Sequence, residues 1–175
     1  MGITSTAARE SACVFGTQCQ LTGVLTAPSG ARQDQLCVLF LTSGLLHHIG
    51  PNRLHVELAR SLARQGVAGL RFDFSGAGDS EPGMLGGEVR QRSVRELAEA
   101  MDYLQSHHGL QRFVLFGTGS GADDALASAQ RDPRIVGAVL LDGPAFPAGR
   151  FRLYRALSYS LPRLLTSQQL RKHGK

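Results

Sequence analysis

Short hydrophobic runs open the chain and suggest where a sheet begins. Residues 13–16 and 21–26 have the length and composition of two strands, and they lead to a turn at 28–30, as in an antiparallel hairpin. Residues 36–41 form a continuous apolar run without alternation, which is typical of a strand that is covered on both faces. The pattern therefore predicts a hairpin beside the first strand of a parallel sheet.

Helical periodicity follows, and it alternates with further apolar strands. Leu54, Leu58 and Leu62 recur at helical spacing after Asn52, which can cap the helix, and Gly66 can end it. The next expected elements are a strand at 67–72, a helix at 93–108, a strand at 113–116, a helix at 122–130 and a strand at 135–141. This alternation predicts the α/β class, with a mostly parallel sheet between two layers of helices.

Length and composition predict the number of domains, the cellular location and the state of the cysteines. A chain of 175 residues, 42% of them hydrophobic, can bury the core of one domain. A run of about 18 apolar residues and a basic-then-apolar leader are both missing from the sequence, so we expect a cytoplasmic location. The three cysteines form no CxxC pair, which favours ordinary thiols over a disulfide framework or a zinc site.

The net charge of +5 is concentrated near the C-terminus. Residues 143–175 contain seven Lys or Arg and no Asp or Glu, and apolar side chains recur between the arginines at helical spacing. The sequence thus predicts a flexible N-terminus at 1–12, a core at 13–147 and a basic amphipathic helical tail at 148–175. Contact with an acidic membrane surface through residues 150–172 is one use of such a tail. We do not expect nucleic acid as a partner.

A glycine-rich turn at 117–121 lies between a predicted strand and a predicted helix, where α/β proteins bind ligands. One interpretation is the GxSxG nucleophile elbow, whose central position is Gly119. The other is the dinucleotide turn GxGxxG/A, formed by Gly117, Gly119 and Ala122, with Asp142 as a ribose ligand. A Rossmann half normally begins at its fingerprint strand, so the hairpin, strands and helices before this turn favour the elbow.

Three further segments resemble α/β-hydrolases. Residues 71–80 carry an aspartate followed by a Gly-x-Gly-x-Ser turn, and residues 43–54 and 139–142 resemble the oxyanion loop and the strand after the elbow. The likeness is to the exosortase-A-associated hydrolases and to serine-aminopeptidase-like hydrolases. In that group the elbow has a cysteine or serine followed by Ser-Gly-Ala, and residues 117–122 match it except at Gly119.

This resemblance implies a three-layer α/β-hydrolase fold that acts on ester, thioester or amide bonds. It puts the nucleophile at Gly119, which has no side chain to carry an acyl group, with Ser120 as a weak substitute and Asp142 as an acid. It assigns the oxyanion hole to the backbone N–H groups of Leu45 and Ser120. The family's catalytic histidine follows a later strand than any in this chain. We therefore expect a C-terminally truncated fold with weak or absent activity on its own.

Other functions stay open beside this one. The chain could be a non-catalytic interaction protein or a gene remnant, or a nucleotide-binding module that uses residues 117–122. For the hydrolase, a small acyl-containing substrate and no cofactor are expected, and the basic tail would be the first helix of a cap over the site. A truncated sheet would also expose an edge, which favours a homo-oligomer.

Polar residues outside the elbow have simpler explanations. We expect His47 and His48 to be solvated or packing residues rather than a catalytic base. Asp73 and Asp79 flank a glycine turn, and a metal site would need more oxygen ligands than this loop offers. Turn stabilisation is therefore predicted for both aspartates, and no metal site is predicted.

Overall fold

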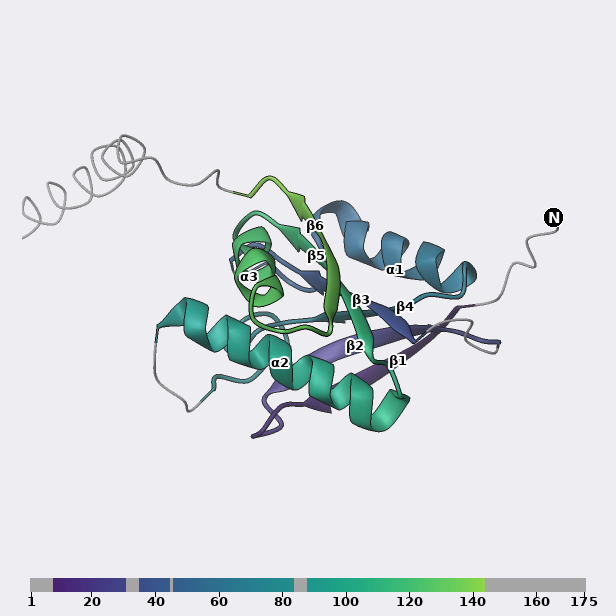
Figure 1. Cartoon of the computed structure of the whole chain (residues 1–175), viewed down its shortest axis with the longest axis horizontal. Helices are drawn as coiled ribbons and strands as arrows, with labels where there is room; N and C mark the ends of the chain where they lie inside the picture. Colours follow the sequence, from purple (N-terminus) through teal and green to yellow (C-terminus); the bar gives the residue numbers. More distant parts are fainter. Residues whose placement is uncertain (1–7, 31–34, 45, 84–87, 144–175) are drawn as a thin grey trace, which may run out of the picture. The chain divides into compact units, whose positions relative to one another are not determined.

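One twisted sheet organises the molecule (Figure 1). The structure, a computed structural model, describes residues 8–30, 35–44, 46–83 and 88–143. Its strands in sheet order are β1 (Ala8–Phe15), β2 (Leu21–Pro28), β4 (Ala68–Phe72), β3 (Leu36–Leu41), β5 (Arg112–Thr118) and β6 (Ile135–Leu141). The β1, β2 and β4 strands pair antiparallel in turn, whereas β4, β3, β5 and β6 are parallel. The predicted class, a mostly parallel sheet with an N-terminal antiparallel hairpin, is confirmed.

Among the described residues, three α-helices cover the two faces of this sheet. They are α1 (Leu54–Arg64), which a 3-10 turn at Pro51–Arg53 precedes, α2 (Val89–His108) and α3 (Ser120–Ala129). Alternate side chains of β3 enter two cores, because successive residues of a strand point to opposite faces. Val38 and Phe40 pack with Ala59 of α1. On the other face the larger core joins Cys37, Leu39 and Leu41 to Leu97, Ala100, Met101 and Leu104 of α2 and Ala125 of α3. The helices therefore form the two outer layers (Figure 1).

Three local expectations differ from the structure. Strand β1 begins at Ala8, so residues 8–12, predicted as flexible, pair with β2 in the hairpin. Asn52 is not the cap of α1: it lies in the preceding turn at φ 49, ψ 34, and Arg53 takes the cap position without a side-chain bond. Helix α2 begins four residues early, at Val89. Gly66 and Gly109 end α1 and α2 at positive φ as predicted.

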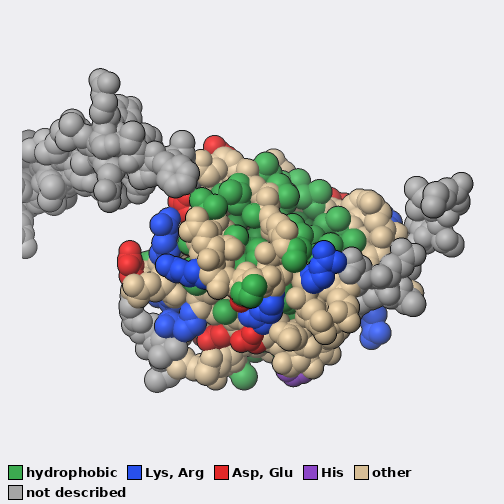
Figure 2. Space-filling view, viewed as in Figure 1, with side chains coloured by type: hydrophobic (Ala, Val, Ile, Leu, Met, Phe, Trp, Pro, Cys, Tyr) green, Lys and Arg blue, Asp and Glu red, His purple; other side chains and the backbone are tan. Residues whose placement is uncertain are grey.

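Strand β6 is the last strand of the described sheet and is poorly covered. Its large apolar side chains at Val136, Val139, Leu140 and Leu141 are exposed. Hydrophobic side chains gather on this face of the molecule, over the region of β6 (Figure 2). The first of two compact units in the chain ends at Gly143. The predicted tail at 148–175 lies outside the described residues. Within the part of the chain that the structure describes, no helix has the length and apolar character needed to cross a bilayer.

Candidate functional site

The turn between β5 and α3 lies at the carboxyl edge of the sheet. Gly119 has φ 55 and ψ −121 and lies at the N-cap of α3. Its N–H donates to the carbonyl of Leu141 at the end of β6 over 2.9 Å. A Cβ at Gly117 would lie 2.4 Å from the carbonyl oxygen of Gly121, and a Cβ at Gly121 would lie 2.6 Å from that of Leu41. The flanking glycines therefore allow the strand, the helix and the β3 end to approach closely.

Ser43, in the loop after β3, fills the space that a side chain at position 119 would need. A Cβ on Gly119 would lie 2.5 Å from Ser43 Oγ and 2.8 Å from Ser43 Cβ. The register of the sheet explains this contact, since Leu41 of β3 is paired with Gly117 of β5. Ser43 and Gly119 are 76 positions apart in the sequence, and the motif at 117–122 does not indicate that they are in contact.

Two hydroxyl–amide contacts join the loop to the elbow. The Gly44 N–H donates to Ser120 Oγ over 2.8 Å, and the Ser120 N–H donates to Ser43 Oγ over 3.4 Å. The Ser120 amide, predicted as an oxyanion donor, thus points at a hydroxyl oxygen of the protein itself. The Ser120 hydroxyl, predicted as a weak substitute nucleophile, accepts the hydrogen bond from the Gly44 N–H of the loop. Leu45, the other predicted donor, lies outside the described residues.

Asp142 stands beside the elbow but its role as an acid stays a prediction. It follows Leu141, whose carbonyl accepts the Gly119 N–H. Asp142 is exposed and has φ 51, a left-handed conformation that aspartate tolerates better than most residues. The same conformation fits a turn former at the end of a strand.

A cleft of about 670 Å³ opens next to Ser120. Its walls come from the loop after β3, the turn after β4, the start of α2 and the start of α3, and include Thr42, Gly44, Phe74, Ser75, Arg90, Ser93, Asp123 and Asp124. Burial raises the pKa of Asp124 to about 6, although the Ser93 hydroxyl hydrogen-bonds to it and favours the ionised form. Asp123 pairs with Arg90 at 3.7 Å. No local sequence pattern indicated that Asp124 would lie half-buried in this cleft.

Two histidines and two aspartates meet on the loops after β3 and β4. His48 Nδ1 lies 2.7 Å from Asp73 Oδ2, and His47 Nε2 lies 3.0 Å from Asp79 Oδ2. The hydrogen bond from His47 lowers the pKa of Asp79. The two turn aspartates therefore have specific side-chain partners, and the histidines are neither merely solvated nor mere packing residues. The partners in these two pairs are 25 and 32 residues apart in the sequence, so no local pattern predicts their contact.

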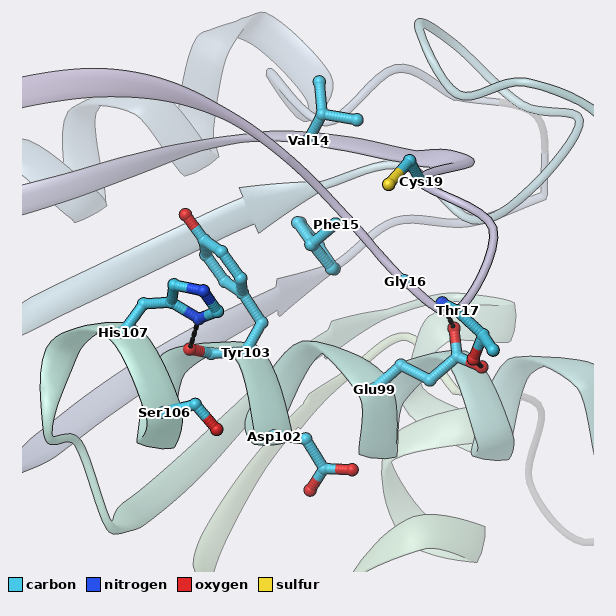
Figure 3. A pocket seen from close by; sticks show the side chains of 10 residues that line it. All are labelled: Val14, Phe15, Gly16, Thr17, Cys19, Glu99, Asp102, Tyr103, Ser106 and His107. Atoms are coloured by element: carbon cyan, nitrogen blue, oxygen red, sulfur yellow. Dashed lines mark hydrogen bonds between the residues drawn. The ribbon is translucent and has the colours of Figure 1, made fainter.

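A second cavity, of about 410 Å³, lies between the β1–β2 turn and α2 (Figure 3). Its Glu99 accepts hydrogen bonds from the backbone and hydroxyl of Thr17. Tyr103 stacks on His107, and both project from α2. The residues lining this cavity come from β1, the turn after it and α2, so the elbow contributes nothing to it.

Comparisons with known proteins point to one group. A family model described as serine aminopeptidase, S33, matches residues 33–173. No curated protein matches the sequence. Among solved structures, a cold-adapted esterase from an Arctic intertidal metagenomic library is similar with a TM-score of 0.58 and 20% identity, over 78% of this chain and 61% of that one.

Two further solved structures resemble the chain equally well. The Pyrococcus furiosus esterase Pf2001 has a TM-score of 0.62 at 16% identity, over 82% of this chain and 54% of that one. The α/β hydrolase GrgF from Penicillium sp. sh18 has a TM-score of 0.61 at 14% identity, over 93% of this chain and 55% of that one. At such identities the likeness concerns the fold, and the chain spans 54–61% of the length of these three proteins.

Proposed function

Because this chain belongs to the serine aminopeptidase S33 family of hydrolases, we propose that it binds a small ester, thioester or amide at the turn 117–121 and hydrolyses it weakly or not at all on its own. The observation that carries this proposal is Gly119. Its backbone has the positive φ of a strained turn between strand and helix, yet the residue offers no atom that could form an acyl-enzyme.

The surroundings of Gly119 support binding without turnover. Ser43 Oγ takes the space beside position 119 and accepts the Ser120 N–H, so a ligand carbonyl would compete with it for this donor. The Ser120 hydroxyl already accepts from Gly44, and α3 begins at this residue, so its side chain belongs to the helix rather than to the tip of the turn. An attack by Ser120 would need a different backbone geometry.

Hydrolysis of p-nitrophenyl acetate and butyrate tests the weak activity directly. We expect the rate with the protein to stay near that of a heat-inactivated sample, and Ser120→Ala to leave it unchanged, because neither Gly119 nor Ser120 forms the acyl intermediate. Release of p-nitrophenolate is followed by its absorbance. Sustained turnover that Ser120→Ala abolishes would show that Ser120 is a nucleophile and would overturn the proposal.

A thiol placed at the elbow tests the binding geometry separately. In Gly119→Cys/Ser43→Gly the new side chain has room, and its position at the start of α3 favours the thiolate. The thiolate would attack the ester carbonyl, release p-nitrophenolate and remain as a thioester, so a burst of about one equivalent is expected. Gly119→Cys alone should react more slowly because Ser43 obstructs it.

The wild-type protein is the matched control for this burst, since it carries the same three native cysteines. A double variant that folds as the wild type does by circular dichroism, yet gives no burst above it, would contradict an acyl-binding elbow. The finer likeness to exosortase-associated hydrolases, the pseudoenzyme character and nucleotide binding at 117–122 stay predictions. A lack of any rise in Tm with millimolar NAD, NADP or ATP would remove the last of these.

The structure also supports a test of self-association, in which copies of this chain pair through β6. Strand β6 ends the described sheet, and its exposed Val139, Leu140 and Leu141 form an apolar edge. We expect light scattering to give a mass that rises with concentration towards a dimer or larger species. Leu140→Lys should reduce this association, and a stable wild-type monomer at all concentrations would contradict it.

A further inference from the structure

Four side chains gather where the loop after β3 meets the turn after β4. His47 and His48 come from the first segment, and Asp73 and Asp79 from the second. One nitrogen or oxygen atom from each can be chosen so that all four lie within 4.8 Å of one another. We infer that these residues form a binding site for one Zn²⁺ ion, which would fasten the loop after β3 to the turn after β4.

The buried carboxylate of Asp73 is the strongest sign that a ligand belongs here. Its side chain is completely buried, and Oδ1 has no hydrogen-bond partner among the residues that the structure describes. Its other oxygen, Oδ2, faces His48 Nδ1 and accepts the Asp79 N–H over 3.1 Å. Burial of an acceptor without a partner is unfavourable. A cation among the four residues would balance the buried negative charge of this carboxylate.

The turn after β4 holds both oxygens of Asp73 close to Asp79. A Cβ on Gly78 would lie 2.1 Å from Asp73 Oδ2 and 2.8 Å from Oδ1, so the carboxylate is packed against the turn that carries Asp79. Only glycine allows this approach, and its φ of 50 suits glycine as well. The two carboxylates are thus brought together by the backbone, although a sequence reading of the turn alone found too few ligands.

The distances in the cluster suit a tetrahedral zinc site. Bonds of about 2.0–2.1 Å at tetrahedral angles place two ligand atoms about 3.3 Å apart. His48 Nδ1 and His47 Nε2 lie 2.7 Å and 3.9 Å from Asp73 Oδ2, and His47 Nε2 lies 3.0 Å from Asp79 Oδ2. Shifts of less than about 1 Å would bring these atoms to the required separation.

The donor set selects the class of ion. Imidazole nitrogens favour zinc and its neighbours over magnesium and calcium, and two carboxylates neutralise a divalent charge. Ion binding would replace the protons of the two histidine–aspartate hydrogen bonds. When Nε2 of His47 binds the ion, the ring proton must move to Nδ1, which now accepts the Ile49 N–H over 3.3 Å. Ile49 is exposed, so water can accept its N–H instead.

Four protein ligands leave no open position, so the ion would be structural. It would fix the loop that carries Ser43 and Gly44, the residues in contact with the elbow. Asp79 and His47 are partly exposed, with side-chain exposures of 60% and 35%, and give the ion a path from solvent. This inference is independent of whether the elbow binds an acyl compound.

Zinc titration of the full chain after dialysis against EDTA tests the site. Isothermal titration calorimetry should show one Zn²⁺ per chain, and the Tm should rise with zinc concentration but not with Mg²⁺. Co²⁺ should give the strong visible absorption of a tetrahedral complex. Asp79→Asn and His47→Gln change partly exposed side chains, and each should weaken zinc binding at least about tenfold.

Controls separate this cluster from other metal ligands. His107→Gln removes an exposed histidine of α2 and should leave zinc affinity unchanged, and alkylation of the exposed thiol of Cys19 should do the same. The inference is overturned if wild-type protein binds no Zn²⁺ or Co²⁺. Equal affinity in wild type, Asp79→Asn and His47→Gln, or loss of binding on alkylation, would overturn it as well.

Discussion

Replacing Gly117 by alanine should lower the free energy of unfolding by about 3 kcal/mol, because the new methyl group has nowhere to go. Its Cβ would lie 2.4 Å from Gly121 O and 2.7 Å from the N and Cα of Ala122. All three atoms are backbone atoms of the first turn of α3, and β5 is held between β3 and β6. Urea denaturation followed by circular dichroism measures the loss.

Gly137→Ala is the matched control for this substitution. Within the described part of the chain, a Cβ at position 137 in β6 would meet only Val114 Cγ2, at an ordinary 3.6 Å. The change in unfolding free energy should stay within about 0.5 kcal/mol. If both variants lose the same free energy of unfolding, the close approach of β5 and α3 at the elbow is not what requires glycine at position 117.

Acid should destabilise the protein through His55. This ring is fully buried, packed near Phe40 and Phe116 at centroid distances of 5.3 Å and 5.7 Å. Burial lowers its pKa from 6.5 to about 4, although the nearby backbone of His48 acts in the opposite direction. As pH falls from 6.5 towards 4, the unfolded chain takes up a proton that the folded state resists. About 3 kcal/mol of unfolding free energy should be lost in this window.

Denaturation curves at pH 7 and pH 4 measure this loss for wild type, His55→Leu and His107→Gln. The leucine keeps the site apolar and cannot take up a proton, so His55→Leu should lose about 3 kcal/mol less than wild type on acidification. His107 is exposed, and its replacement should leave the pH dependence as it is. An unchanged pH dependence in His55→Leu would show that His55 is not responsible.

Local pattern was enough to predict most elements of the fold. The unbroken apolar run of β3 and the leucine spacing of α1 depend on neighbours a few residues away, and both elements formed where predicted. The failures lie at boundaries. Residues 8–12 join β1 because β2 offers them a pairing partner, and Asn52 loses its cap role to the left-handed turn before α1.

The candidate site divides in the same way. The sequence by itself located the elbow, because a strand, a glycine-rich turn and a helix follow one another directly at Gly117 and Gly119. It also showed that no side chain stands at position 119. These features involve consecutive residues, so the sequence alone is enough to recognise them.

Only the tertiary structure decided what surrounds that elbow. The parallel register that pairs Leu41 with Gly117 brings Ser43 against Gly119, and the order β4-β3-β5 places Asp73 and Asp79 beside His47 and His48. Burial, which sets the pKa of Asp124 and His55, likewise depends on elements distant in the chain. Periodicity reports which face of an element is buried, whereas contacts between loops depend on strand order and register, and a single sequence does not encode these locally.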